Sequence, residues 1–327
     1  MSNQTSLRWG ILGTGWIADR FVGDLKRLAD QTVAAVGSRT LEGAQAFAGQ
    51  HGIGRVHGSY QALVDDPAVD VIYVATPHPF HHPHARLALE AGKPVLLEKP
   101  FTMDAAEAAD LAALAHKKGL FLMEAMWTRF LPHIAEVRSI LSAGTLGEIV
   151  TIQADHGQWF EKNAEHRLFA PALGGGALLD LGVYPVSFAS FVLGLPAKVT
   201  ALSDRAFTGV DGQTSVVLQY ASGAHAVLNT TLSAATPNRA AVVGTEARLE
   251  IDRTFYSPST FTVTHRDGRV LRRFEVPYEG NGLREQAVEV ARCLRSGLVE
   301  SPLMTVGETV AIMGTMDEIR RQIGLVY

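Results

Sequence analysis

The sequence predicts an α/β protein: an N-terminal doubly wound parallel sheet, followed by a C-terminal α+β part on a mostly antiparallel open sheet. Three observations predict this. Apolar runs alternate with helix-period segments over the first 125 residues or so, a glycine-rich turn joins the first strand to the first helix, and strand-like runs separated only by turn signals fill about 197–276. A chain of 327 residues is long enough for two such domains, which we place at 1–125 and 126–327.

The N-terminal elements alternate regularly. Residues 7–13 form a β-type run, and residues 14–29 carry apolar side chains at helical spacing. The later runs are apolar on both faces, which is typical of parallel strands covered by helices on two sides. Further strands are expected at 32–38, 69–76, 94–99 and 120–124, and further helices at 41–52, 81–93 and 104–119.

The C-terminal part has a different rhythm. Turn signals such as VDGQ, ASG and RDG separate its strand-like runs, which indicates antiparallel connections. Helices that pack around this sheet or back on the first domain are expected at about 131–143, 178–193, 282–296 and 305–323. The expected strands are 198–207, 214–220, 224–232, 239–244, 247–252, 260–266 and 270–276.

Composition limits the partners. The chain is 47% hydrophobic and 19% charged with a formal net charge of −4, and it has no block of Lys and Arg that would attract nucleic acid or an anionic membrane. The only cysteine, Cys293, lies in a helix-period segment and is read as a core thiol. We find no run of about 18 apolar residues and no signal-peptide pattern, so we expect a cytoplasmic protein with a small-molecule partner.

Gly13, Gly15 and Ala18 spell G-x-G-x-x-A between the first strand and the first helix. The first glycine permits the tight turn, the second lets a pyrophosphate approach the backbone, and the small third residue lets strand and helix pack closely. Trp16 and Ile17, which open the helix, belong to the same expected cofactor contact. A plain glycine turn is the alternative, but the position inside an N-terminal βαβ unit favours dinucleotide binding.

The end of the second strand indicates which dinucleotide. Proteins that bind NAD usually carry Asp or Glu there, and this chain reads Gly37, Ser38, Arg39. Arg39 can stack on adenine and pair with a 2′-phosphate, and Ser38 can donate a hydrogen bond. We therefore predict NADP, with NAD less favoured; the alternative is that Arg39 is a solvated surface residue.

Ligands of parallel sheets collect beyond the carboxyl ends of strands. Thr76, Pro77 and His78 follow one strand and are expected along the nicotinamide side of the cofactor, with His81 opening the next helix. Two further histidines, His82 and His84, raise the question of a metal, but zinc sites normally add a carboxylate or thiolate, and we predict no metal.

The stretch LLEKP ends another buried strand with Glu98, Lys99 and Pro100. Lys99 is expected at the rim where nicotinamide lies, and Pro100 fixes the local backbone. Beside a cationic ring, and partly desolvated, a lysine favours its neutral form, as a general base requires. The alternative is a surface lysine that serves solubility. Glu98 is included among the expected cofactor contacts.

Four stretches resemble the Gfo/Idh/MocA oxidoreductases in order: GILGTGWIA, VDVIYVATPHPFHH, ALEAGKPVLLEKP and GGGALLDLGVYP. The resemblance covers essentially the whole chain. It is closest to the branch of dimeric dihydrodiol dehydrogenases and NADP-dependent D-xylose dehydrogenases, through MEAMWTRFLP and GGGALLDLGVYP. Many members end the last motif in histidine where this chain has Tyr184, which argues against inositol dehydrogenase activity.

The resemblance implies that Lys99 and Tyr184 share proton transfer and that Asp180 orients them. The spacing agrees, because residues four apart share one face of a helix, although Pro185 can kink that helix. Tyr184 as a core residue and Asp180 as a helix cap are the alternatives. The substrate pocket is expected to use these three residues with Trp127, Arg129 and Phe130. Lys99 and Trp127 are also included among the expected cofactor contacts.

These observations predict an NADP-dependent oxidoreductase that transfers hydride between nicotinamide and a hydroxyl or carbonyl of a sugar, polyol or cyclic trans-diol. A dinucleotide-binding sensor of the same fold is the alternative, and a histidine-metal hydrolase is less favoured still. The loop Gly174–Gly176 is either a flexible ligand loop or a simple hinge. Because a broad sheet needs one face covered, we expect a homodimer or higher homo-oligomer through the C-terminal sheet.

Overall fold

The computed structural model describes residues 6–327. These residues divide into two compact units. The first runs to Trp127 and also takes up Gly280–Val310, and the second comprises Thr128–Glu279 and Ala311–Tyr327. The chain passes from the first unit to the second after Trp127 and returns to the first for Gly280–Val310, a return that the expected domains 1–125 and 126–327 did not include.

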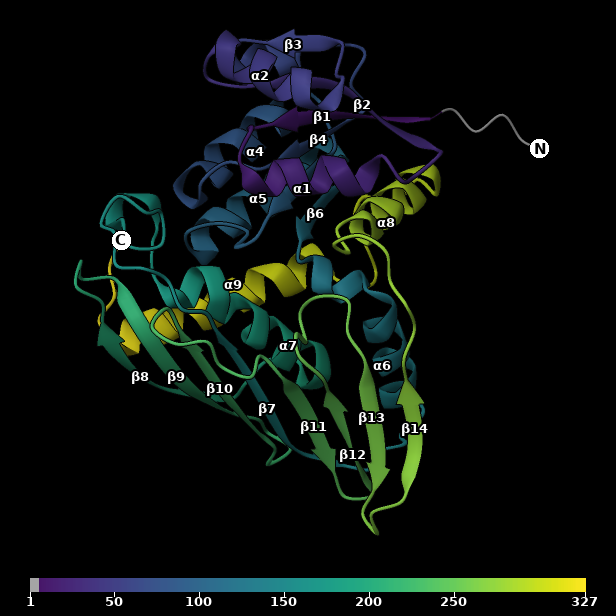
Figure 1. The fold of residues 1–327 in the computed structure, drawn as a ribbon, viewed down its shortest axis with the longest axis vertical. Helices are drawn as coiled ribbons and strands as arrows, with labels where there is room; N and C mark the ends of the chain where they lie inside the picture. Colours follow the sequence, from purple (N-terminus) through teal and green to yellow (C-terminus); the bar gives the residue numbers. More distant parts are fainter. Residues whose placement is uncertain (1–5) are drawn as a thin grey trace. The chain divides into compact units, whose positions relative to one another are not determined.

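A parallel sheet forms the centre of the first unit (Figure 1). Within the described residues it has six strands in the order β3-β2-β1-β4-β5-β6. The strands are β1 (Leu7–Leu12), β2 (Gln31–Gly37), β3 (Arg55–His57), β4 (Val71–Val74), β5 (Val95–Glu98) and β6 (Leu122–Ala125). The order reverses between β1 and β4, and in such sheets this switch point is where a crevice for ligand opens at the carboxyl ends.

The helices of this unit begin and end at the residue types that the sequence suggested. Thr40 caps the amide of Gly43 at the start of α2, and Gly52 ends that helix in a left-handed conformation. Strand β3 and helix α3 were not expected from the sequence, because both are too short to show periodicity. The helices are α1 (Trp16–Leu25), α2 (Leu41–His51), α3 (Tyr60–Val64), α4 (His81–Glu90), α5 (Ala105–Lys118) and α8 (Arg284–Arg295).

Helix α8 joins the first unit through a buried carboxylate. Asp24 in α1 is 1% exposed and accepts hydrogen bonds from the backbone amides of Asn281 and Leu283, both at 2.9–3.0 Å. Gln31 donates to the carbonyl of Ala287 at 3.2 Å. These contacts explain why a segment that the sequence assigned to the second domain packs on the first.

The second unit is built on a large open sheet, with eight strands among the residues described. Its order is β14-β13-β12-β11-β7-β10-β9-β8. The pairs are antiparallel except β7 with β10, which run parallel. The strands are β7 (Ile149–Gly157), β8 (Lys198–Arg205), β9 (Asp211–Gln219), β10 (His225–Thr231), β11 (Ala240–Gly244), β12 (Ala247–Ile251), β13 (Phe261–His265) and β14 (Val270–Phe274).

The prediction of a mostly antiparallel sheet is confirmed, but the central strand β7 was missed. Its inward side chains are Ile152, the small Ala154 and the polar His156, while the apolar Val150 is exposed, so its apolar signal is weak. Helices α6 (Pro132–Ser142) and α7 (Val183–Leu193) cover one face of the sheet (Figure 1). Helix α9 (Val306–Gln322) runs through the boundary at Val310 between the two units.

The segment Pro171–Leu193 is the one stretch of the described chain that is long and apolar enough to cross a membrane. Our expectation that no such run exists was therefore too strict. In its most apolar 18-residue window 78% of the residues are buried inside the protein, as in the core helix of a soluble domain. By itself this is weak evidence for a membrane span.

Candidate functional site

The glycine turn of the first unit fits a pyrophosphate. Gly13 has φ +109°, and a Cβ there would lie 2.7 Å from the carbonyl oxygen of Ala75, so only glycine fits. Gly15 caps α1 without a side chain, and a Cβ on it would meet nothing within 4 Å, which leaves room for a ligand. Ala18 is fully buried, Ile17 is partly buried and Trp16 is 70% exposed. The free amides of the α1 N-terminus suit an anion.

Ser38 and Arg39 lie at the end of β2, directly before α2. Arg39 is exposed and Ser38 is half-buried. Burial, reinforced by the charge of Arg39, lowers the pKa of His84 to about 4, so a neutral imidazole lies near the guanidinium. Tyr60 packs edge-on against the His84 ring, with centroids 4.5 Å apart. This is a basic, partly aromatic surface at the position where a dinucleotide ribose binds in this kind of sheet.

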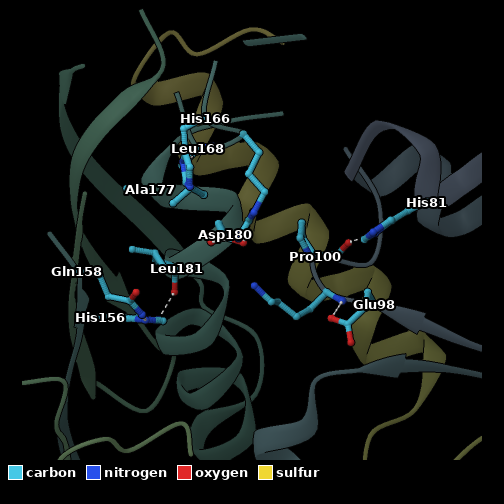
Figure 2. A network of polar contacts seen from close by, with 12 residues as sticks. His81, Glu98, Pro100, His156, Gln158, His166, Leu168, Ala177, Asp180 and Leu181 are labelled. Carbon is cyan, nitrogen blue, oxygen red and sulfur yellow. Dashed lines mark hydrogen bonds and ion pairs between the residues drawn. The ribbon is translucent and has the colours of Figure 1, made fainter. Parts of the chain in front are cut away.

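The histidines after β4 bind protein groups. His81 is 1% exposed, and its ring nitrogens lie 2.7 Å from the Thr76 carbonyl and 2.8 Å from the Pro100 carbonyl (Figure 2). Burial outweighs these acceptors and, with the charges of His78 and Lys99, lowers the pKa of His81 to about 3. A neutral ring has one N–H and donates to one of these carbonyls at a time, but both nitrogens face the protein. His81 therefore joins the two loops and would act on a cofactor only through them.

The other histidines of this stretch have partners as well. His82 pairs with Asp110 at 2.7 Å, and His84 lies 3.1 Å from the Thr76 hydroxyl. His78 is buried at the start of a short 3₁₀ turn, and Pro77 before it is exposed. Over residues 6–327 no cluster of three or more His, Cys, Asp or Glu side chains could hold a metal ion.

Lys99 follows β5 and is partly exposed. The peptide bond between Lys99 and Pro100 is cis. Glu98 is 3% exposed, and its carboxylate accepts from the Tyr73 hydroxyl and from the Lys99 amide, the latter at 3.2 Å (Figure 2). Tyr73 is itself stacked on Phe21 at 4.0 Å. The Glu98 side chain therefore holds the backbone of Lys99, a role that differs from the direct cofactor contact expected from the sequence.

The residues after β6 serve different purposes. Trp127 ends the first unit and is partly exposed, whereas Arg129 and Phe130 are buried in the second. Arg129 donates to the Ser187 carbonyl in α7 at 2.8 Å, and its guanidinium lies 5.0 Å from the Phe191 ring centroid. These contacts hold Arg129 against α7. Its expected role in binding substrate stays a prediction.

Asp180 and Tyr184 do not lie on one regular α-helix as expected. Asp180 belongs to a π-helical turn, Leu178–Gly182, and Tyr184 to the first turn of α7. Pro185 has no N–H to donate to the carbonyl of Leu181. That carbonyl lies 3.2 Å from Nδ1 of His156 instead (Figure 2). A π turn of this kind is frequent at functional sites.

Asp180 is buried and paired. It is 4% exposed, and both its oxygens accept from the Arg167 guanidinium, at 3.0 and 3.1 Å. Such a two-point pair fixes the plane of the carboxylate. The sequence analysis missed Arg167, because it lies in an irregular segment with no periodicity to place it.

Tyr184 sits among rings that the sequence did not reveal. It is 7% exposed, with the His156 ring edge-on at 5.1 Å and the Tyr256 ring at 5.0 Å between centroids. His156 stacks on Tyr256 at 3.9 Å, and Gln158 lies 3.0 Å from its Nε2. Since the amide NH₂ of Gln158 can only donate, these contacts favour a His156 ring that carries its proton on Nδ1. Two aromatic neighbours thus fix the phenol of Tyr184.

Close packing requires two of the three glycines before this segment. A Cβ on Gly175 would lie 2.8–2.9 Å from three backbone carbonyl oxygens. Gly176 has φ +121°, and a Cβ there would lie 2.0 Å from Oδ1 of Asp211. Packing therefore explains Gly175 and Gly176, and a role of the loop in ligand contact or as a hinge stays a prediction.

Changing Gly176 to alanine is expected to lower the free energy of unfolding by about 3 kcal/mol, from backbone strain and overlap with Asp211. Chemical denaturation measures it. Gly209→Ala is the matched control, because Gly209 also has positive φ but open space around it. Equal losses in the two variants would show that the overlap has no energetic effect.

Taken together, the first unit carries a dinucleotide fold with Lys99 at a strand end, and the second carries Tyr184 beside the Asp180–Arg167 pair. These features define a nucleotide-dependent oxidoreductase. Sequence comparison agrees: residues 7–126 match the oxidoreductase family with the NAD-binding Rossmann fold, and residues 134–250 match the GFO/IDH/MocA C-terminal domain. The chain belongs to the Gfo/Idh/MocA family, as its motifs suggested.

Curated relatives are similar over nearly their whole length. Trans-1,2-dihydrobenzene-1,2-diol dehydrogenase of Xenopus tropicalis is 39% identical over 98% of this chain and 99% of its own. The human protein of that name is 37% identical over 98% of each chain. The protein is accordingly a dehydrogenase that acts on CH–OH groups.

Solved structures agree in fold. Aldose-aldose oxidoreductase from Caulobacter crescentus, complexed with glycerol, has a TM-score of 0.88 at 28% identity over 97% of both chains. A 3-ketoreductase from Actinomadura kijaniata, in complex with NADP and TDP-benzene, has a TM-score of 0.86 at 28% identity over 98% of both chains.

Proposed function

We propose that this protein is an NADP-dependent dehydrogenase that oxidises a hydroxyl of a sugar, a polyol or a cyclic trans-diol and runs in reverse as a carbonyl reductase. The observation that carries the proposal is the phenol of Tyr184, held by two aromatic rings, in the helix that directly follows the buried Asp180 carboxylate and its Arg167 partner. Relatives named dihydrodiol dehydrogenase and aldose oxidoreductase support this choice of substrate class.

When bound, the nicotinamide would accept the hydride. The residues of this chain would manage the proton: as the substrate carbon loses hydride, its hydroxyl proton would pass to the phenolate oxygen of Tyr184 or to the neutral amine of Lys99, and a C=O bond would form. Asp180, fixed by Arg167, would orient the hydroxyl. Gly13, Gly15 and the α1 N-terminus would hold the pyrophosphate.

The test is an absorbance assay at the reduced-nicotinamide band, with NADP and NAD against xylose, glucose, inositol and a trans-dihydrodiol. We expect turnover with NADP on xylose, glucose or the dihydrodiol, and none on inositol. Binding of NADP without turnover on any of the four would favour the sensor alternative. The presence of Lys99, Asp180 and Tyr184 together with dehydrogenase relatives favours the enzyme.

Arg39→Ala is expected to weaken NADP binding by at least about tenfold, because a charged hydrogen bond to the 2′-phosphate contributes about 1.5–3 kcal/mol. NAD binding should weaken much less, since NAD would lose only the stacking of Arg39 on adenine. Fluorescence titration with each nucleotide measures this. Arg86→Ala serves as a control for loss of a positive charge, since Arg86 is engaged with Glu90 and Asp110 on the surface. Unchanged NADP affinity in Arg39→Ala would refute the assignment of Arg39.

We also propose self-association through the outer face of the large sheet. The strand register places Leu202, Val217 and Val227 on one face, and these side chains are 75, 40 and 49% exposed. A depression of about 530 Å³ lies on the same sheet, and Gln153 and Thr262 are among the residues that line it. Sedimentation velocity should show a dimer or larger species, and a monomer at all concentrations would contradict it.

A further inference from the structure

A buried carboxyl group supports the segment that carries Asp180 and Tyr184. Asp211 begins β9 and is fully buried, although its sequence VDGQ reads as a turn. Its Oδ2 accepts from the Leu178 amide at 2.7 Å and from the Thr214 hydroxyl at 3.1 Å. Leu178 is the first residue of the π-helical turn, whose initial amides have no partner within the turn. Asp211 therefore caps the turn from the neighbouring sheet.

The other oxygen of Asp211 faces Gly176 and Tyr327. A Cβ on Gly176 would lie 2.0 Å from Oδ1 of Asp211 and 3.2 Å from the Tyr327 hydroxyl oxygen, so these two oxygens both lie close to this glycine. Both oxygens are buried, and within residues 6–327 no partner meets strict hydrogen-bond geometry for either of them. Burial raises the pKa of Tyr327 well above its usual value, and the charge of Asp211 and a weaker hydrogen-bond interaction with its side chain add to this. The phenol therefore stays protonated, with its hydrogen available to Asp211.

Two arginines keep residues 323–327 in place. Arg205 in β8 donates to the carbonyls of Ile323 and Gly324 at 2.9 and 2.7 Å. Arg320 in α9 lies 5.4 Å from the centroid of the Tyr327 ring. The Arg205 guanidinium and the Tyr327 phenol are charged or titratable neighbours of Asp211, whereas the Arg320 guanidinium acts on Tyr327. The Tyr327 side chain is thus brought against the cap by contacts from two elements.

We propose that Asp211 is a positioning residue for the Asp180–Tyr184 segment and that Tyr327 completes its support. The proposal rests on the proposed function, because it assigns the segment a catalytic task. A buried carboxyl is costly, and an apolar side chain would pack there at lower cost. Only an acceptor can hold the Leu178 amide, and a carboxylate also interacts favourably with a helix N-terminus. The expected benefit is a fixed direction for the Tyr184 phenol.

The test compares wild type with Asp211→Asn, Tyr327→Phe and Asp211→Ala. Asp204→Asn is the control, because Asp204 is exposed on the neighbouring strand β8. Hydrogen exchange followed by mass spectrometry is measured for peptides spanning 174–186. The pH dependence of kcat/KM is measured with NADP and the best substrate of the panel.

We expect faster exchange in 174–186 for Tyr327→Phe and Asp211→Ala, and a shift of the half-maximal pH of kcat/KM by about half a unit or more. A variant that merely lowered the folded fraction would scale the profile without shifting it. Asp211→Asn should exchange less rapidly than Asp211→Ala, since its amide oxygen can still accept from Leu178.

Exchange and pH profiles equal to those of Asp204→Asn would overturn the proposal. If Asp211→Ala does not fold, Tyr327→Phe decides alone, because it removes only one hydroxyl. Failure of the proposed function is separate: wild type would then lack turnover on the whole panel, and the exchange measurements would still show whether Asp211 and Tyr327 support the segment.

Discussion

Replacing Lys99 by methionine is expected to lower kcat by at least about 100-fold, because a positioned general acid or base contributes about 10² to 10⁴ in rate. Tyr184→Phe is expected to have a loss of similar size. If both groups serve one proton transfer, the double variant should be little worse than the worse single variant, since residues that act as a unit are strongly non-additive. Steady-state kinetics of the four proteins measures this coupling.

This double-mutant cycle of Lys99→Met and Tyr184→Phe is informative because Lys99 belongs to the first unit and Tyr184 to the second. Their joint action stays a prediction that follows from the family resemblance. Lys117→Met, in the exposed last turn of α5, is the matched control for loss of a lysine. Turnover of Lys99→Met within about threefold of wild type would exclude Lys99 as a general acid or base, and fully additive losses would show that the two groups act independently.

Asp211 is expected to make stability depend on pH in an unusual direction. Burial raises its pKa to about 7, against 3.8 for an ordinary aspartate. The folded state therefore keeps a proton that the unfolded state releases between these values. Stability contributed by this group is complete below pH 4 or so and is lost as pH rises towards 7, at about 1.4 kcal/mol per pH unit, up to about 4 kcal/mol.

Asp211→Asn should abolish this loss. The difference in unfolding free energy between variant and wild type should move in favour of the variant from pH 4 to 7 and remain constant above that. Chemical denaturation at several pH values measures it, and subtraction removes the opposite trend of carboxylates such as Asp66, whose pKa lies far below its usual range beside Arg55. A pH-independent difference would mean that Asp211 ionises normally inside the fold.

Local patterns were enough for most of the Rossmann part, although β3 and α3 are too short to show a period. The turn at Gly13 and Gly15, the residues Arg39 and Lys99 that follow strands, and the helix ending at Gly52 all depend on neighbours within one βα unit. Periodicity and turn chemistry report such short-range structure directly. The strands of the large sheet were also recognisable, except β7, whose inward positions include the small Ala154 and the polar His156.

The surroundings of Tyr184 could not be predicted in this way. His156, Arg167 and Tyr256 come from three separate places in the chain and meet Asp180 or Tyr184 only after the sheet has formed. The same is true of Asp211. Its local sequence, VDGQ, is typical of a turn, but the folded protein buries the Asp211 side chain. No spacing rule connects residues so far apart, because the pairing of strands brings them together.

The order of residues was thus sufficient for the family and for the nucleotide fold, since these depend on short motifs with local physical causes, whereas the catalytic roles of Lys99 and Tyr184 stay predictions. Only the tertiary structure divided the expected helix into a π turn that carries Asp180 and a helix α7 that carries Tyr184, gave Asp180 its arginine and placed a buried acid at the start of the turn. Those features arise from desolvation and from long-range pairing, which act only once distant segments are packed.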